Sequence, residues 1–141
     1  MSRIKIAFPE NVSYTARIPV RITDLNYGNH VGNDAVLSMI HEARMQFLTH
    51  FGFTELNCAG VGLIMSDVGI EFKKEIFYGD TLSVQIAAIN FSSVGFDLFY
   101  RLLNKENIVV ALAKTGMICY NYEAKKIAAV PAEVKEKLAV E

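Results

Sequence analysis

One long helical segment set among strand-like runs is the feature that most limits the folds open to this chain. Between residues 33 and 51, apolar side chains recur every three or four residues, which is typical of an amphipathic helix. They are Val36, Met39, Ile40, Ala43, Phe47 and Phe51. We predict that Asn33 caps the start of this helix and that Gly52 lies just beyond its end.

Strand-like runs lie on both sides of the helix, and short turns join those that follow it. They cover residues 13–23, 61–76, 81–92, 96–104 and 108–122. Consecutive strands linked by tight turns form an antiparallel sheet. We therefore predict an α+β fold in which an antiparallel sheet of about five strands wraps around one long central helix. The other face of the sheet would expose apolar side chains, so we expect a homodimer or a homotetramer.

Size and composition narrow the class of protein further. The 141 residues suit one domain, and 52% hydrophobic against 21% charged residues can build a real core. A net charge of -1, with lysine and arginine scattered, argues against nucleic-acid binding. The apolar runs are too short to cross a membrane, and the N-terminus does not resemble a signal peptide. Cys58 and Cys119 lack metal-ligand and C-x-x-C spacing, so we expect reduced thiols, a cytoplasmic location, and neither metal nor cofactor.

A polar loop with the sequence DLNYGNHVGND, from Asp24 to Asp34, leads into the predicted helix. Capping and turns account for part of it, because Asn33 and Asp34 suit a helix start and the two glycines allow tight turns. The unpaired N–H groups of a helix start can also polarise a substrate carbonyl. Gly32 would let a substrate approach that backbone closely. The loop is therefore our candidate functional site.

The order of elements and three short motifs resemble the hotdog fold, and within it the 4-hydroxybenzoyl-CoA thioesterase-like acyl-CoA thioesterases. The motifs are D-L-N-Y-G-N-H-V-G-N at 24–33, H-E-A-R at 41–44, and a strand at 70–72 that runs to Y-G-D at 78–80. This resemblance spans roughly residues 13–122 and implies a single hotdog domain over 1–141. It also implies a thioester hydrolase that acts on an acyl-CoA or acyl-carrier-protein substrate.

One departure from the family pattern affects the mechanism. Relatives place their catalytic carboxylate four residues before the histidine, and this chain has the amide Asn26 there. An amide cannot accept a proton near neutral pH, although it can orient a water molecule. Asp24, Asp34, Glu42 and His30 are the remaining candidates for activating water. If the segment before the helix is extended, Asp24 would project on the same side as Asn26.

Each candidate also has a purely structural interpretation. Asp24 could close a turn, Asp34 could interact with the helix dipole, Glu42 could pair with Gln46, and His30 could bond to the backbone. Contacts to the substrate are expected from Tyr27, Gly32 and Asn33, and Tyr27 could equally serve packing. His41 is expected to be structural, because it lies on the helix among apolar neighbours.

Two other functions remain open on the same fold. A β-hydroxyacyl thioester dehydratase or hydratase would pair His30 with Glu42 of a neighbouring subunit. A non-catalytic protein would bind an acyl thioester without turning it over, which would be consistent with Asn26 in place of the usual acid. Thioester hydrolysis remains the leading prediction, with the helix start polarising the carbonyl and a nearby carboxylate or His30 activating water.

Overall fold

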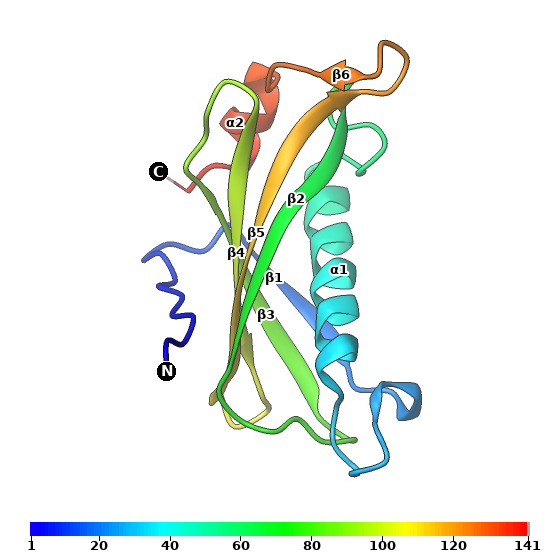
Figure 1. Ribbon diagram of the computed structural model, residues 1–141, viewed down its shortest axis with the longest axis vertical. Helices are drawn as coiled ribbons and strands as arrows, with labels where there is room; N and C mark the ends of the chain where they lie inside the picture. Colours follow the sequence, from blue (N-terminus) through cyan, green and yellow to red (C-terminus); the bar gives the residue numbers. More distant parts are fainter. Residues whose placement is uncertain (141) are drawn as a thin grey trace.

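The computed structural model describes residues 1–140, which form an antiparallel sheet with a long helix, α1 (Asn33–His50), against one face (Figure 1). The strands are β1 (Tyr14–Pro19), β2 (Gly62–Phe72), β3 (Thr81–Ile89), β4 (Gly95–Leu103), β5 (Val109–Asn121) and β6 (Lys126–Ile127). Their order across the sheet is β1-β3-β4-β5-β2, and the short β6 pairs with β5. A 3-10 turn, η1 (Ile22–Asp24), precedes α1, and a short helix, α2 (Ala132–Leu138), ends the chain. The predicted α+β architecture is confirmed, with β6 in addition to the five long strands.

The core lies between α1 and the central strands, because alternate residues of those strands face the helix. Ile86, Tyr100 and Ala113 are register partners on neighbouring strands, and all three are fully buried. On the helix, Ile40 and Phe47 are likewise fully buried. Burial of these side chains fixes the face that each strand presents to α1.

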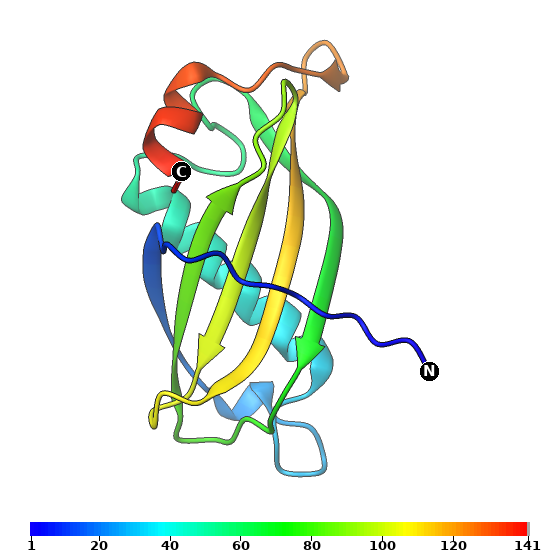
Figure 2. The ribbon, with the colours of Figure 1, turned by 90° about the vertical axis from the view of Figure 1, so that its left-hand side faces the viewer.

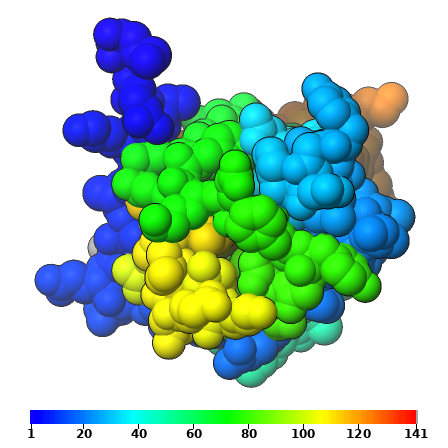
Figure 3. All heavy atoms as spheres, turned by 90° about the horizontal axis from the view of Figure 1, so that it is seen from below, coloured from blue at the N-terminus to red at the C-terminus, as the bar shows by residue number. Residues whose placement is uncertain are grey.

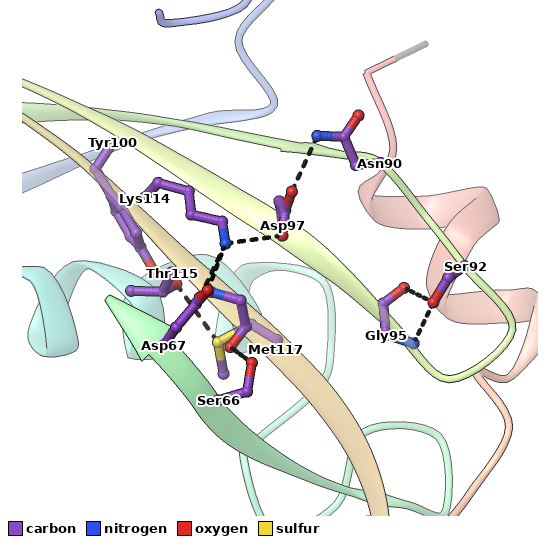
Figure 4. A network of polar contacts seen from close by, with 11 residues as sticks. Ser66, Asp67, Asn90, Ser92, Gly95, Asp97, Tyr100, Lys114, Thr115 and Met117 are labelled. Carbon is purple, nitrogen blue, oxygen red and sulfur yellow. Dashed lines mark hydrogen bonds and ion pairs between the residues drawn. The ribbon is translucent and has the colours of Figure 1, made fainter. Parts of the chain in front are cut away.

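Edge strand β2 is packed less completely than the central strands. Its helix-facing residues Met65, Val68 and Phe72 remain 37%, 40% and 40% exposed. A bulge between Met65 and Asp67 interrupts its pairing with β5. The Asp67 carboxylate accepts hydrogen bonds from the Gly116 amide at 2.8 Å and from Lys114 Nζ at 2.9 Å, which fastens the bulge to β5 (Figure 4).

The N-terminal segment crosses the face of the sheet that α1 leaves open (Figure 2). The Ile6 amide donates to Glu71 Oε1 at 3.0 Å, and the Arg101 guanidinium lies 4.4 Å from the centre of the Phe8 ring. The expectation that a second subunit must cover this face is therefore too simple, because the chain itself covers part of it.

The two ends of α1 test the predicted caps. Gly32, not Asn33, is the N-cap, so that prediction was wrong by one residue and Asn33 is the first residue of the helix. Gly52 follows the C-cap Phe51 with φ +85°, as predicted, because glycine adopts this left-handed conformation without strain. Among residues 1–140, no helix is long and apolar enough to span a membrane.

Candidate active site

The polar loop before α1 folds back on itself as a small hairpin. Leu25 and Val31 form an isolated antiparallel bridge, and the Asn26 amide donates to the His30 carbonyl at 3.0 Å. Asn29 turns the chain with φ +63°, a conformation that asparagine tolerates better than most residues. The hairpin thus holds Asn26 and His30 next to the start of α1.

Asn26, His30 and Asp34 lie together around two glycines. A Cβ atom added to Gly32 would lie 2.8 Å from Asp34 Oδ1 and 3.8 Å from Asn26 Cβ. One added to Gly28 would lie 3.1 Å from Asn26 Oδ1 and 3.3 Å from His30 Nε2. Asn26 is therefore near both an imidazole and a carboxylate, and we call Asn26, His30 and Asp34 the helix-start cluster.

The helix start supplies hydrogen-bond donors beside this cluster. The bond from the Val36 amide to the Gly32 carbonyl, at 3.2 Å, is the first i to i−4 bond of the helix. The amides of Asn33, Asp34 and Ala35 come before it and have no intrahelical acceptor. They sit at the positive end of the helix dipole, where developing negative charge is stabilised.

The cluster side chains also have structural contacts. Asn26 Oδ1 accepts from the Gly28 amide at 2.8 Å, and His30 Nδ1 lies 3.3 Å from the Val31 carbonyl oxygen. These contacts fix both side chains relative to the helix start. His30 and Asn33 line a cavity of about 270 Å³ that extends to residues 72–76, where Lys73 and Lys74 follow β2.

Asp24 and Glu42 are placed elsewhere. Asp24 is the last residue of the 3-10 turn η1, and the extended residue Leu25 follows it. Its buried carboxylate accepts from the Arg21 amide at 2.8 Å, which supports the structural interpretation of this residue. Glu42 accepts from Gln46 Nε2 at 2.9 Å, as its structural interpretation predicted. Both residues line a separate cavity of about 410 Å³ between β1 and α1.

Tyr27 is fully exposed at the tip of the loop, so within one subunit it forms no wall of a cavity. Gly32, in contrast, is buried, and the Asp34 carboxylate lies where a side chain on Gly32 would have to begin. Of the three predicted substrate contacts, Gly32 and Asn33 therefore lie at the helix start and Tyr27 does not. Within residues 1–140, no group of three or more His, Cys, Asp and Glu residues is arranged to hold a metal ion.

A polar network further along α1 was not predicted from the sequence. His41 Nε2 lies 2.6 Å from Glu55 Oε1, and Arg44 Nε donates to Glu55 Oε2 at 3.0 Å. Arg44 Nη1 donates to the Tyr100 hydroxyl at 3.3 Å, and that hydroxyl lies 2.8 Å from Thr115 Oγ1. His41, expected to be only structural, is thus the outer end of a network that begins in the core.

The fold and the helix-start cluster together define a hotdog domain with a site suited to polarising a carbonyl. The model of the thioesterase-like superfamily matches residues 20–138, and the chain belongs to this superfamily. A 1,4-dihydroxy-2-naphthoyl-CoA hydrolase of Microcystis aeruginosa is 30% identical over 106 residues, which are 73% of this chain and 76% of that protein.

Two solved structures illustrate how closely the fold is shared. A 1,4-dihydroxy-2-naphthoyl-CoA thioesterase from Synechocystis has a TM-score of 0.80 at 23% identity, over 88% of this chain and 93% of that chain. A thioesterase from Thermus thermophilus, complexed with coenzyme A and Zn, has a TM-score of 0.78 at 18% identity, over 92% of this chain and 95% of that chain. The predicted hotdog thioesterase family is confirmed, and thioester hydrolysis is the activity of that family.

Proposed function

We propose that this protein hydrolyses the CoA thioester of a hydroxylated aromatic acid and that the helix-start cluster is its catalytic centre. The observation that carries the mechanism is the position of the Asp34 carboxylate against Gly32, beside the amides that open α1. The substrate class is proposed from the 30% identical relative, a 1,4-dihydroxy-2-naphthoyl-CoA hydrolase.

In the proposed reaction, the thioester carbonyl oxygen accepts hydrogen bonds from the first amides of α1. Asp34 accepts a proton from water, whose oxygen adds to the carbonyl carbon. Negative charge then moves to the carbonyl oxygen, where the helix start stabilises it. Collapse of this adduct breaks the C–S bond and releases the acid and the CoA thiolate, which takes up a proton. Asn26 and His30 orient the water, since an amide can donate and accept hydrogen bonds without titrating.

The CoA portion is proposed to leave the helix start along the lower end of the molecule. Figure 3 shows the loop before α1, the connection after β2 and the β4–β5 turn side by side on this surface. A cavity of about 580 Å³ lies here between residues 74–80 and 104–106. Two lysines and three acidic residues line it, and the exposed Phe77 and Tyr78 provide rings on which a base can stack.

A homodimer is proposed to complete the site along β2. An exposed edge strand with apolar side chains has backbone N–H and C=O groups that can pair with another strand. A second copy of β2 can supply that strand in antiparallel orientation. Val68→Lys is expected to yield monomers in sedimentation velocity, whereas Val94→Lys, at a similarly exposed valine in the β3–β4 turn, should leave the dimer intact. A Val68→Lys protein that remains dimeric would rule out this interface.

We place the enzyme in the cytoplasm, in keeping with its two free cysteines.

The test of the reaction is hydrolysis of a panel of aromatic and aliphatic acyl-CoAs, followed with a thiol-reactive dye. We expect Asp34→Asn to lower kcat by about one hundredfold, the low end of general-base contributions. Glu42→Gln is the matched control, since it makes the same change on the same helix and keeps an acceptor for Gln46. The proposal fails if no thioester in the panel is hydrolysed, or if Asp34→Asn retains the wild-type kcat.

A further inference from the structure

Two separate cavities lie along the side of α1 that faces β2. Asn33, Leu37 and His41 follow one another at four-residue spacing, so they share one face of the helix. Asn33 lines the 270 Å³ cavity with Phe72, and Leu37 and His41 line a second cavity, of about 560 Å³, with Met65. We call these two cavities together, lined by the three α1 residues and by Met65 and Phe72 of β2, the α1–β2 groove.

The walls of the larger cavity are mostly apolar. Besides Leu37 and Met65, they include Leu56 and Leu63. An apolar cavity with a few convergent polar groups is the usual composition of a small-molecule site. Three of the polar groups that line this cavity, His41, Arg44 and Glu55, are joined to one another.

These three side chains are linked from the core outward. The Arg44 side chain is only 6% exposed, and Tyr100, to which it donates, is fully buried. Arg44 Nε donates a hydrogen bond to Glu55 Oε2, and Glu55 Oε1 lies 2.6 Å from His41 Nε2. The imidazole of His41 is 58% exposed, so it is oriented by the network and still open to a ligand. Because Glu55 occupies Nε2, the Nδ1 edge of the ring is left for that ligand.

The distance from the helix start suits an aromatic acyl group. Eight residues separate Asn33 from His41, a rise of about 12 Å along the helix. Helical side chains lean toward the N-terminus, so the imidazole lies nearer the helix-start amides than that rise. In the inference drawn below, an aromatic acyl group spans this remaining distance, with its carbonyl at those amides and a ring hydroxyl at the imidazole.

We propose that the α1–β2 groove holds the acyl group and that the His41–Glu55 pair selects hydroxylated aromatic acyl groups by hydrogen bonding to a ring hydroxyl. The inference rests on the proposed thioesterase function, and it identifies the residues that read the substrate. A site built to hydrogen-bond a hydroxyl discriminates strongly against the analogue that lacks it, because its own polar groups are then left unpaired. Arg44 is a positioning residue here, since it acts on the substrate only through Glu55.

The experiment compares kcat/KM for two pairs of thioesters that differ only in hydroxyl groups. The pairs are 4-hydroxybenzoyl-CoA with benzoyl-CoA, and 1,4-dihydroxy-2-naphthoyl-CoA with 2-naphthoyl-CoA. We expect the wild type to prefer the hydroxylated member of a pair, and His41→Ala and Glu55→Gln to reduce that preference about tenfold, the worth of one hydrogen bond. The readout is the ratio of kcat/KM within each pair, because a general loss of activity lowers both members of a pair alike. His50→Ala removes an exposed imidazole at the far end of the same helix and should leave the preference unchanged.

A binding measurement separates this inference from the proposed reaction. The non-hydrolysable thioethers 4-hydroxyphenacyl-CoA and phenacyl-CoA are titrated into the wild type and into His41→Ala. A tenfold loss of preference in their dissociation constants supports the role of His41 even in a protein that hydrolyses nothing, an outcome that would refute only the catalytic proposal. A preference that is absent in the wild type, or unchanged in His41→Ala, overturns the inference whatever the hydrolysis assay gives.

Discussion

Replacing Arg44 with methionine tests how much the buried polar network stabilises the fold. Methionine keeps most of the aliphatic length of the side chain but supplies no donor for Glu55 or Tyr100. Arg44 is 6% exposed and makes hydrogen bonds of 3.0 Å to Glu55 Oε2 and 3.3 Å to the Tyr100 hydroxyl. Although burial opposes its charge, the interactions with Tyr100 and Glu55 outweigh burial and raise the pKa of the guanidinium. The native fold therefore favours the charged form that methionine removes.

The magnitude follows from what each partner loses. Removing one member of a fully buried ion pair costs about 3–5 kcal/mol, because the other charge is left without a partner. Glu55 is 22% exposed and keeps its contact with His41, and Tyr100 keeps Thr115, so the cost should lie below that range. We expect a loss of about 2–3 kcal/mol, close to one hydrogen bond to a charged group. With an unfolding entropy near 2.1 cal/mol/K per residue, the thermal midpoint should fall by about 8 °C.

Differential scanning calorimetry at neutral pH and one protein concentration measures this shift. Arg17→Met is the matched control, because Arg17 is exposed on β1 and donates to Ser83 at the surface, so its midpoint should change by no more than about 2 °C. The double variant Arg44→Met/Glu55→Leu should recover part of the loss, since it leaves no unpaired carboxylate. A single Arg44→Met protein as stable as the wild type would show that the network makes no net contribution to stability.

Three further perturbations have defined outcomes. Gly32→Ala should fold normally, since φ −73° suits alanine, but its methyl group would lie 2.8 Å from the helix-start carboxylate and should lower kcat about tenfold or more. Gly69→Ala, whose nearest side-chain contact would be 3.9 Å, is the control and should behave as wild type. Burial raises the pKa of Cys58 to about 12 and that of Cys119 to about 11, so a thiol reagent at pH 8 should label neither thiol until the protein is denatured. A hydrogen bond from a lysine ammonium lowers the pKa of Asp67 from 3.8, so this carboxylate stabilises the fold above that pH and the stabilisation is lost as pH falls through the lowered pKa. In Asp67→Asn, the thermal midpoint should therefore fall less between pH 5 and pH 3 than it does in the wild type. An equal fall in both proteins would contradict this reasoning.

Local periodicity was enough to predict the helices and strands of the fold. The errors concern where an element ends, because contacts with other parts of the chain determine those ends. The run predicted over 61–76 ends as a strand at Phe72. Both Lys73 and Lys74 direct their amides at the same Val110 carbonyl, at 2.9 Å and 3.1 Å, so the regular ladder cannot continue. Nothing in the residues themselves marks this end, because strand propensity does not record which carbonyl an amide will meet.

The helix-start cluster was only partly predictable for a similar reason. The local i,i+4 pairing of Glu42 with Gln46 was anticipated from spacing alone and is confirmed. The grouping of Asp24 with Asn26 assumed an extended segment, whereas η1 turns the chain there and the Asp24 carboxylate caps the turn at the Arg21 amide. Spacing along the sequence does not record that a carboxylate is already engaged by the turn in which it lies, as Asp24 is by the Arg21 amide.

The His41–Glu55 pair could not be found by spacing, but one physical signal did point toward it. Arg44 follows Ile40 by four residues and precedes Phe47 by three, so it lies within the apolar stripe of α1 rather than on its solvent face. A cation in that position must be paired, because an isolated buried charge is too costly to keep. The stripe therefore required a carboxylate from outside the helix, and Glu55, in the loop that follows α1, is that partner. The same Glu55 carboxylate also contacts His41. The partner that the buried Arg44 charge requires therefore also positions the His41 imidazole in the α1–β2 groove.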